Sequence, residues 1–270
     1  MNAFEPGAPP PTALDKGAGD HEFAAWAATV AGDLLLRVRQ QELTGRELKD
    51  AGDLAAHNLL LDLITRYRPG DAMLSEEGPE EGTDKPRLRA DRVWIVDPLD
   101  GTREFSEPPR DDWAVHVALW QSGELVAGAV AQPGLGTTFH TGAPPVVPPR
   151  PAEQILGRPR IAASRTRPPA FVHALLEHLG GELVPMGSAG AKVISVVRDV
   201  SDAYVHSGGQ YEWDSAAPVA VARAAGLHTS RVDGSPLVYN QDDVLLPDLL
   251  VCRPELTEPI LDFLREHGRD

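Results

Sequence analysis

Two segments near the start of the chain carry apolar residues at every third or fourth position, the spacing of an amphipathic helix. In the first, the series is Phe23, Trp26, Val30, Leu34 and Val38. It predicts a core-facing helix over about 21–40 with Asp20 as its N-cap. In the second, the series runs from Leu54 to Tyr67 and stops before Pro69, so we expect a helix that starts near Asp53.

The pattern then changes to one that is typical of strands. Residues 93–96 form a continuous β-prone run, broken by Pro98, which predicts a buried strand that delivers Asp97 to its end. Alternating apolar residues over 113–119 and an apolar run over 125–131 flank a Gln-Ser-Gly turn and predict a hairpin.

The second half of the chain follows a different rhythm. Residues 142–159 hold six prolines and predict a surface loop or a domain junction. After it, short β runs alternate with helical ones, which indicates an α/β layer arrangement. The expected strands are 161–163, 183–186, 203–206 and about 248–252, and the expected helices follow Pro169, Ala189 and Asp214. We therefore predict a disordered tail over 1–20, an N-terminal α+β domain over 21–157 and a C-terminal α/β domain over 158–270.

The net charge and the number of cysteines limit which partners and which kinds of metal site we expect. The chain has 270 residues and a formal charge of −15, which argues against nucleic acid or an anionic membrane as a partner. A single cysteine, Cys252, forms no internal disulfide, so a bound metal would be held by oxygen. The first residues lack the features of a signal peptide, and no long apolar stretch suits a membrane span, so we expect a cytoplasmic protein.

Two carboxylates stand three residues apart where the predicted strand ends, in the string Asp97-Pro98-Leu99-Asp100-Gly101-Thr102. Residues three apart on a continuing strand point to opposite faces, so these two converge only if the proline and the glycine bend the chain. Converging carboxylates need a cation, since otherwise one of them must hold a proton. Oxygen ligands favour Mg²⁺ over Mn²⁺ or Ca²⁺. The alternative is ordinary turn chemistry.

Three further acidic positions suit such a site, and each has a plain structural alternative. Glu76 and its neighbour Glu77 precede an acidic loop, where a solvated face is the usual role. Asp53 and Asp214 stand at expected helix starts, where the alternative role is an N-cap. Gly101 lets the backbone approach a ligand, and the amides after it can receive a phosphate oxygen.

Taken together, these motifs resemble the inositol monophosphatase superfamily. The matching segments are 74–77, 94–102 with Phe105 following, and Trp213-Asp214 with the alanine-rich run after it. Residues 187–192 and 208–218 look most like the CysQ-type 3′-phosphoadenosine 5′-phosphate phosphatases of actinobacteria. The resemblance spans roughly residues 20–255. It implies an α/β (α+β) fold built as a five-layer αβαβα sandwich, and Mg²⁺-dependent, Li⁺-sensitive hydrolysis of phosphate monoesters.

The resemblance also assigns roles to residues. It implies metal ligation by Glu76, Asp97, the carbonyl of Leu99, Asp100 and Asp214. It makes Glu76, Asp53 and Thr102 the catalytic residues, with Asp53 and Thr102 orienting the attacking water. We expect two or three Mg²⁺ per site, with Mn²⁺ as a substitute and Li⁺ as an inhibitor. Many relatives carry a lysine about eleven residues before the water-orienting aspartate; Glu42 stands there, and whether Lys49 replaces that lysine is open.

Substrate contacts are expected from Gly101, Thr102, Ser164, Arg165, Ser188, Lys192 and Glu212. Ser188, at a helix start, and Lys192, one turn later, suit a second phosphate. Ser164 and Arg165 belong to a basic cluster whose alternative role is a solvated loop. Glu212 suits a ribose hydroxyl or a supporting role behind the metal ligands. His116 and His140 are interpreted as packing or surface histidines, because no partner spacing points to a metal site.

The resemblance implies removal of the 3′-phosphate of adenosine 3′,5′-bisphosphate, or of its phosphosulfate analogue, without a covalent intermediate, in sulfate assimilation. Alternatives are an inositol 1-phosphate or fructose 1,6-bisphosphate phosphatase of the same superfamily, and a catalytically inactive nucleotide-binding regulator. A haloacid-dehalogenase phosphatase needs two aspartates two residues apart, whereas Asp97 and Asp100 are three apart. The expected partner is a small phosphorylated substrate, not nucleic acid or membrane; a homodimer stays an option.

Overall fold

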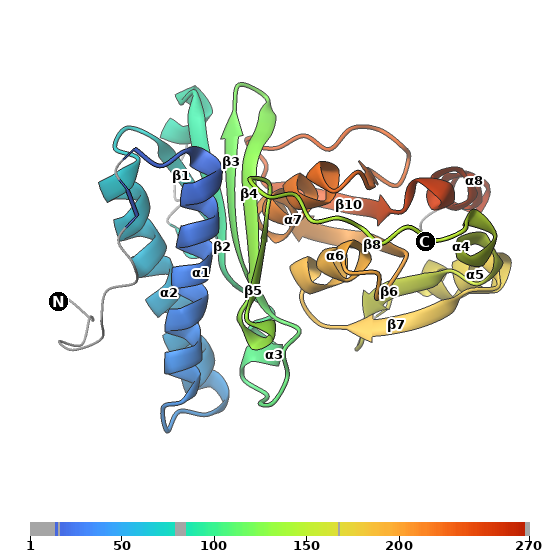
Figure 1. The fold of residues 1–270 in the computed structure, drawn as a ribbon, viewed down its shortest axis with the longest axis horizontal. Helices are drawn as coiled ribbons and strands as arrows, with labels where there is room; N and C mark the ends of the chain where they lie inside the picture. Colours follow the sequence, from blue (N-terminus) through green and yellow to red (C-terminus); the bar gives the residue numbers. More distant parts are fainter. Residues whose placement is uncertain (1–13, 16, 79–84, 167, 268–270) are drawn as a thin grey trace.

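Helices and sheets alternate in five layers (Figure 1). The computed structural model describes residues 14–15, 17–78, 85–166 and 168–267, so most of the predicted tail lies outside the described residues. The first layer consists of α1 (Asp20–Arg39) and α2 (Gly45–Tyr67), which pack on one face of the first sheet. Among the described residues, no helix combines the length and the hydrophobicity that crossing a bilayer requires.

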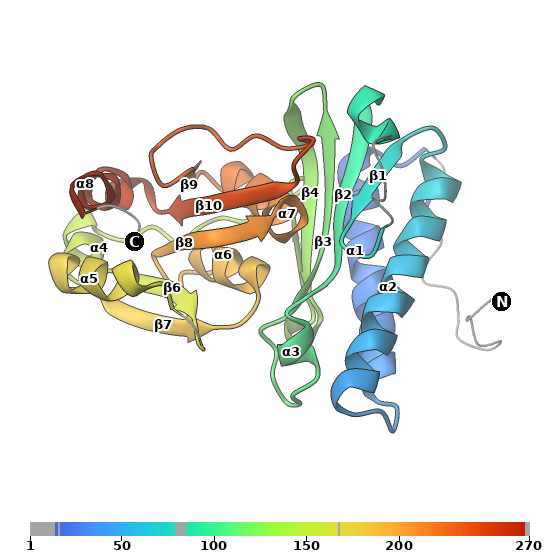
Figure 2. The same cartoon turned by 180° about the vertical axis from the view of Figure 1, so that it is seen from behind.

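The first sheet has the strand order β1-β2-β3-β4-β5. Its strands are β1 (Ala72–Ser75), β2 (Arg92–Asp100), β3 (Ala114–Gln121), β4 (Glu124–Gln132) and β5 (Thr137–His140). β1 pairs with β2 in parallel, and the other neighbours are antiparallel. The short helix α3 (Thr102–Phe105) follows β2 directly and lies at the end of this sheet (Figure 2). The predicted strand and hairpin are therefore confirmed.

The second sheet has the order β7-β6-β8-β10-β9. Its strands are β6 (Arg160–Ser164), β7 (Glu182–Met186), β8 (Ala203–Tyr211), β9 (His228–Ser230) and β10 (Leu245–Cys252). Helices α6 (Ala189–Val197) and α7 (Glu212–Ala224) lie between the two sheets, and α4 (Ala152–Gly157), α5 (Ala170–Leu179) and α8 (Thr257–His267) cover the outer face. The sheets lie on either side of the expected boundary at 157/158, but the division into domains stays a prediction.

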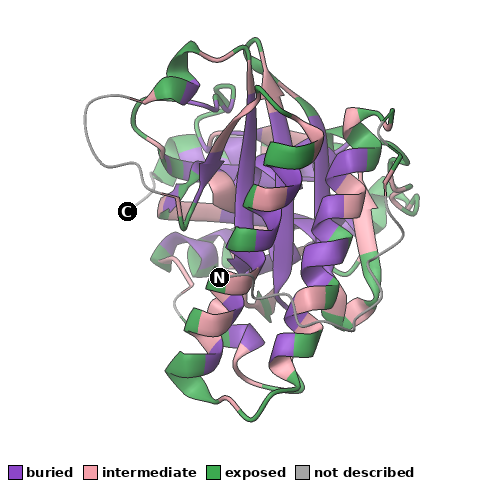
Figure 3. Ribbon diagram, turned by 90° about the vertical axis from the view of Figure 1, so that its left-hand side faces the viewer, coloured by how far each residue is buried: buried purple, intermediate pink, exposed green. Residues whose placement is uncertain are grey.

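Three apolar clusters hold the layers together. One joins α1 and α2 to the first sheet, one joins both sheets through α6 and α7, and one lies under α4, α5 and α8. Figure 3 shows the buried strands of the first sheet behind the half-buried helices. Because the middle cluster takes side chains from both sheets, the two halves of the chain share a core, and their relative position is fixed by packing.

The second helix starts eight residues before the position that the apolar pattern indicates. The structure begins α2 at Gly45, with Leu48 buried in its first turn, so Asp53 lies inside the helix and is not an N-cap. Gly52 misled the prediction. A Cβ atom there would lie 2.8 Å from Phe105, so this glycine allows close packing and does not end a helix. The sequence pattern also gave no prediction for β5, β9 or α8. The loop predicted over 142–159 was wrong in part, because it contains α4, which starts after Pro151 and buries Ile155.

Candidate active site

The end of β2 bends two aspartates into one space. Three steps along β2, from Asp97 to Asp100, stand opposite two steps along β3, from His116 to Ala114, so the ladder contains a bulge. The backbone amide of Leu99 donates to Asp97 Oδ1 at 3.0 Å and helps to hold the bend. The predicted convergence of the two carboxylates is confirmed.

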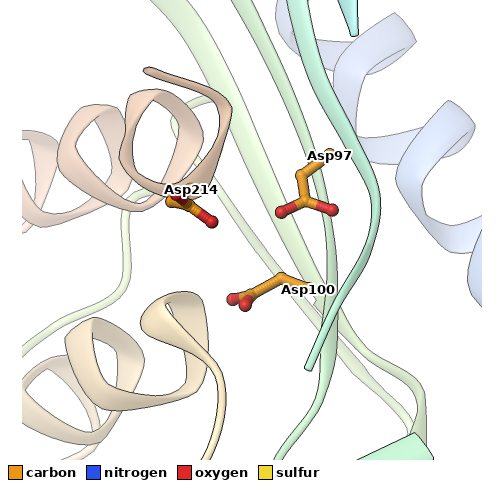
Figure 4. Close-up of side chains that lie close together, drawn as sticks. All are labelled: Asp97, Asp100 and Asp214. Atoms are coloured by element: carbon orange, nitrogen blue, oxygen red, sulfur yellow. The ribbon is translucent and has the colours of Figure 1, made fainter. Parts of the chain in front are cut away.

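Asp214 joins this pair from the other half of the chain. One carboxylate oxygen from each of Asp97, Asp100 and Asp214 lies within 4.8 Å of the other two. All three side chains point into the space between β2 and the start of α7 (Figure 4). Asp214 is the third residue of α7 and not its N-cap, and its Oδ2 accepts the backbone amide of Tyr211 at 2.6 Å.

The three carboxylates differ sharply in how the protein supports their charge. Burial, followed by repulsion from Asp100 and Glu76, raises the pKa of Asp97 well above its usual value. Burial and then Asp100 raise the pKa of Asp214 to about 6. Burial also acts to raise the pKa of Asp100, but contacts with His116, Ser188 and a backbone amide outweigh it and lower that pKa to about 2.

Asp100 is held by the start of α6. Ser188 Oγ donates to Asp100 Oδ2 at 2.5 Å, and the amides of Ala189 and Gly190 donate to the same carboxylate at 3.1 and 2.6 Å. A helix N-terminus presents free amides and favours a negative charge. Asp100 on the first sheet therefore anchors a helix of the second half of the chain, and the Ser188 hydroxyl serves Asp100 here.

Glu76 and Asp53 form the outer part of the site. Glu76 keeps a solvent-exposed surface, but partial burial and then repulsion from Asp214, Asp53 and Asp100 raise its pKa to about 7. Burial, followed by repulsion from Glu77, also raises the pKa of Asp53 to about 7. The group of carboxylates within 4.8 Å of one another is Asp97, Asp100 and Asp214, and Glu76 is not part of it, although repulsion from Asp214 and Asp100 acts on Glu76.

One hydrogen bond connects the two elements that carry these outer carboxylates. His57, one turn after Asp53 on α2, has its Nδ1 3.0 Å from the hydroxyl of Ser75, the residue before Glu76. Both His57 and Ser75 are buried. The contact therefore fixes α2 against the end of β1.

The donor set fits a hard divalent cation. Asp97 is fully buried, and its Oδ2 has no hydrogen-bond partner among the described residues. A buried anion without a partner is costly, and a cation shared with Asp100 and Asp214 removes that cost. The group offers carboxylate oxygens, the donor type that hard divalent cations prefer.

The residues expected to contact substrate have other partners in the structure. Lys192 Nζ donates to the carbonyls of Gly187 and Ser188 at 3.2 and 2.7 Å. Arg165 is paired with Glu104 at 2.8 Å. The carboxylate of Glu212 accepts the amides of Asn240 and Gln241. Ser164 ends β6, and Thr102 donates its hydroxyl to the Leu99 carbonyl at 3.2 Å.

His116 is the residue that sequence reasoning missed. Its Nε2 lies 3.2 Å from Asp100 Oδ2, and its Nδ1 lies 3.1 Å from the carbonyl of Trp213. His116 is the cross-strand partner of Asp97. The alternation of β2 and β3 places both side chains on one sheet face and could have found the contact. His140 agrees better with its interpretation as a packing or surface histidine, because it lies on β5. Burial, followed by the charge of His21, lowers the pKa of His140.

The comparisons with known proteins agree with this geometry. The sequence profile described as the inositol monophosphatase family matches residues 20–269. The chain belongs to the inositol monophosphatase family. This membership decides against the haloacid-dehalogenase alternative that the Asp-Gly-Thr string raised.

Relatives within the family cover nearly the whole chain. A 3′-phosphoadenosine 5′-phosphate phosphatase of Mycobacterium tuberculosis (strain CDC 1551 / Oshkosh) is 50% identical over 252 residues, 88% of this chain and 91% of that protein. The 3′(2′),5′-bisphosphate nucleotidase CysQ of Escherichia coli (strain K12) is 29% identical over 243 residues, 86% of this chain and 94% of that protein.

Solved structures confirm the fold. The crystal structure of CysQ from Bacteroides thetaiotaomicron matches with a TM-score of 0.71 and 25% identity over 87% of this chain and 97% of that chain. Inositol monophosphatase II from Staphylococcus aureus MSSA476 matches with a TM-score of 0.76 and 23% identity over 91% and 95% of the two chains. The αβαβα arrangement expected from the motifs is therefore confirmed.

Proposed function

We propose that this protein is a Mg²⁺-dependent phosphomonoesterase that releases the 3′-phosphate of adenosine 3′,5′-bisphosphate to give AMP and phosphate. The observation that carries the proposal is the cluster of the buried Asp97 and Asp100 with the half-buried Asp214, in which one oxygen of Asp97 has no hydrogen-bond partner among the described residues. The choice of substrate is supported by the 50% identical relative named a 3′-phosphoadenosine 5′-phosphate phosphatase. The phosphosulfate form of the nucleotide, a role in sulfate assimilation, inhibition by Li⁺ and a cytoplasmic location belong to the same proposal.

In this proposal, Glu76, Asp97, the Leu99 carbonyl, Asp100 and Asp214 hold two or three Mg²⁺, with Mn²⁺ as a substitute. Bound divalent cations lower the pKa of a water and stabilise charge on the leaving oxygen. The chain itself supplies position. The bulge in β2 aims Asp97 and Asp100 at one space, and the start of α6 fixes the Asp100 carboxylate.

Asp53 and Thr102 are the residues that we assign to the attacking water. A pKa of about 7 lets the Asp53 carboxylate accept a proton at neutral pH. Thr102 donates its own hydrogen to the Leu99 carbonyl, which leaves the oxygen lone pairs free to accept a hydrogen bond from water. Together the two side chains orient a water without forming a covalent intermediate.

The remaining substrate contacts are proposed with the roles that the structure allows. The backbone at Gly101 and Thr102 opens α3 beside the cluster and suits the phosphate that is cleaved. Lys192 supports the Gly187 and Ser188 carbonyls, so its charge would act on a second phosphate from behind α6. Ser164 and Arg165, at the end of β6, and Glu212, before Trp213, face the substrate only if their present contacts rearrange.

A phosphate-release panel tests the function. Purified protein is assayed with adenosine 3′,5′-bisphosphate, inositol 1-phosphate and fructose 1,6-bisphosphate across a Mg²⁺ series and with EDTA. We expect release from the nucleotide at the lowest substrate concentration, and only with Mg²⁺ present. Release from inositol 1-phosphate or fructose 1,6-bisphosphate alone would overturn the substrate assignment. Nucleotide binding without release from any ester would support the inactive regulator.

A further inference from the structure

Tyr211, three residues before Asp214, carries an exposed aromatic ring in a fixed orientation. Tyr211 is 47% exposed. Its ring stacks on that of Trp213, with the ring centroids 4.7 Å apart and the planes 14° from parallel. An isolated surface tyrosine can turn freely, but the stacked indole covers one face of this ring and holds its plane. Tyr211 therefore presents aromatic surface to solvent in a set direction.

The backbone ties this aromatic pair to the metal-binding aspartates. The amide of Tyr211 donates to Asp214 Oδ2 at 2.6 Å. The carbonyl of Trp213 lies 3.1 Å from His116 Nδ1, and the other ring nitrogen of His116 is 3.2 Å from Asp100. Each member of the pair is therefore linked to a group that builds the cluster. Because Asp214 accepts the backbone amide of Tyr211, the Tyr211 ring lies at most the length of one side chain away from this hydrogen bond.

Two glycines lie shortly before Tyr211 in the chain. Gly208 and Gly209 precede it at the end of β8, with φ angles of +106° and +86° that other residues rarely adopt. Gly208 is exposed, and a Cβ atom built on it would meet no atom within 4 Å. Gly208 therefore leaves open space at the end of β8, whereas a Cβ atom on Gly209 would lie 3.4 Å from Leu245, the cross-strand partner of Tyr211.

A nucleotide bound at the cluster needs an apolar surface for its base. Among the residues that the sequence suggested for substrate contact, Arg165, Lys192 and Glu212 are charged and already bonded to protein groups, and the others are small. A guanidinium plane can stack on a base, but that of Arg165 is held in an ion pair with Glu104. Aromatic side chains are the common stacking partners of nucleic-acid bases, and a tyrosine adds no charge that would repel the phosphates.

We propose that Tyr211 is the stacking platform for the adenine ring of the substrate, an inference that rests on the proposed function. In this arrangement the 3′-phosphate lies at Asp97, Asp100 and Asp214, and the base lies against the open face of the Tyr211 ring. Trp213 supports that ring from the other face. Tyr211 contributes to binding and takes no part in the chemical step.

The experiment uses the full chain and compares Tyr211→Ala and Tyr211→Phe with wild type. Leu156→Ala is the control, because Leu156 is 46% exposed on α4 in the outer layer. We expect Tyr211→Ala to raise KM for adenosine 3′,5′-bisphosphate about tenfold with kcat retained, as a lost stacking contact predicts. Tyr211→Phe and Leu156→Ala should stay within about twofold of wild type.

A binding measurement separates stacking from general damage. Calorimetric titration with adenosine 3′,5′-bisphosphate, in Ca²⁺ under conditions without turnover, should show the same loss in Tyr211→Ala. Titration with inorganic phosphate, which has no base, should show none. An equal loss of affinity for both ligands, or an unchanged KM for the nucleotide, would overturn the proposal that Tyr211 stacks on the base. If wild type itself neither binds nor hydrolyses the nucleotide, the proposed function has failed instead.

Discussion

Two buried aspartates in this molecule have opposite electrostatic surroundings. Asp97 and Asp202 are both fully buried. Asp202 lies among three arginines, and although burial acts to raise its pKa, hydrogen bonds and charge from Arg160, with charge from Arg150, outweigh it and lower that pKa. Asp97 forms no ion pair with a lysine or arginine among the described residues, and its pKa is raised. Arginines of the protein itself balance the charge of Asp202, whereas the charge of Asp97 is left for a ligand to balance.

The satisfied cluster has a structural task. Asp199 and Asp202, after α6, bind Arg150 of the proline-rich segment, Arg160 at the start of β6 and Arg253 after β10. Arg253 also donates to the carbonyl of Pro148. These salt bridges therefore hold the proline-rich segment, which connects the two sheets, against the residues at the ends of β6 and β10. At the acidic cluster, no lysine or arginine among the described residues pairs with Asp97, and under the proposed function cations would take that place.

The largest effect is expected from Asp97→Asn. Loss of even a residue that only supports a metal ligand costs about 10–100-fold in affinity or activity, so loss of this carboxylate should reduce turnover by more than about 100-fold. In metal-free buffer the melting temperature should hold or rise, because the substitution removes a buried repulsive charge. Phosphate release and thermal melting check both parts. If Asp97→Asn instead lowered the melting temperature sharply in EDTA, Asp97 would stabilise the fold as Asp202 does, and the contrast between the two residues would be wrong.

Asp202→Asn should have the reverse profile. Asp199 stays bonded to all three arginines, so the substitution removes only the charge-assisted hydrogen bonds of Asp202, at a cost of about 1.5–3 kcal/mol of unfolding free energy. Activity per folded molecule should stay near that of wild type, since Asp202 bonds to Arg150 and Arg160 and not to Asp97, Asp100 or Asp214. Urea unfolding and assays below the transition measure the two quantities. Lost activity with unchanged stability would show that the two carboxylates do not have separate tasks.

The pH dependence of stability should differ between metal-free and metal-loaded protein. The pKa values of Asp53 and Glu76 are raised to about 7, and that of Asp214 to about 6. Between about pH 4, where these groups titrate in the unfolded chain, and pH 7, the native state binds more protons than the unfolded state. The stability of the metal-free protein should therefore fall as the pH rises through this range.

The measurement is a melting temperature at pH 5 and pH 8, in EDTA and in Mg²⁺. In EDTA the value should be lower at pH 8. Added Mg²⁺ should raise it more at pH 8 than at pH 5, because protons and cations compete for the same oxygens. Asp100 and Asp202, whose pKa values are lowered, lose their stabilising charge only at more acidic pH. The lowered pKa values of His57, His140, His206 and His228 act in the opposite direction and reduce the fall in EDTA. Most of this histidine contribution is shared by the two buffers, so the larger effect of Mg²⁺ at pH 8 is the decisive readout.

Local sequence predicted the parts of the site that local geometry creates. The β run before Asp97 and the proline and glycine after it were enough to predict a strand that bends two carboxylates together. Contacts between distant residues were not predictable in this way. His116 reaches Asp100 only because two strands pair, and the partners of Asp202 come from positions 150, 160 and 253. A helix start also escaped prediction, because Gly52 serves packing against Phe105.

The smallest effect is expected where a neutral contact supports the charged site. Ser75→Ala removes the hydroxyl that bonds to His57 and leaves a buried histidine nitrogen unpaired, at a cost of about 1 kcal/mol. Ser235→Ala is the matched control, since its hydroxyl bonds only to Asp233 in an exposed turn. Because Ser75 precedes Glu76, the Mg²⁺ concentration for half-maximal activity should rise a few-fold in Ser75→Ala and stay constant in Ser235→Ala. An unchanged Mg²⁺ requirement in both would mean that this contact stabilises α2 without positioning Glu76.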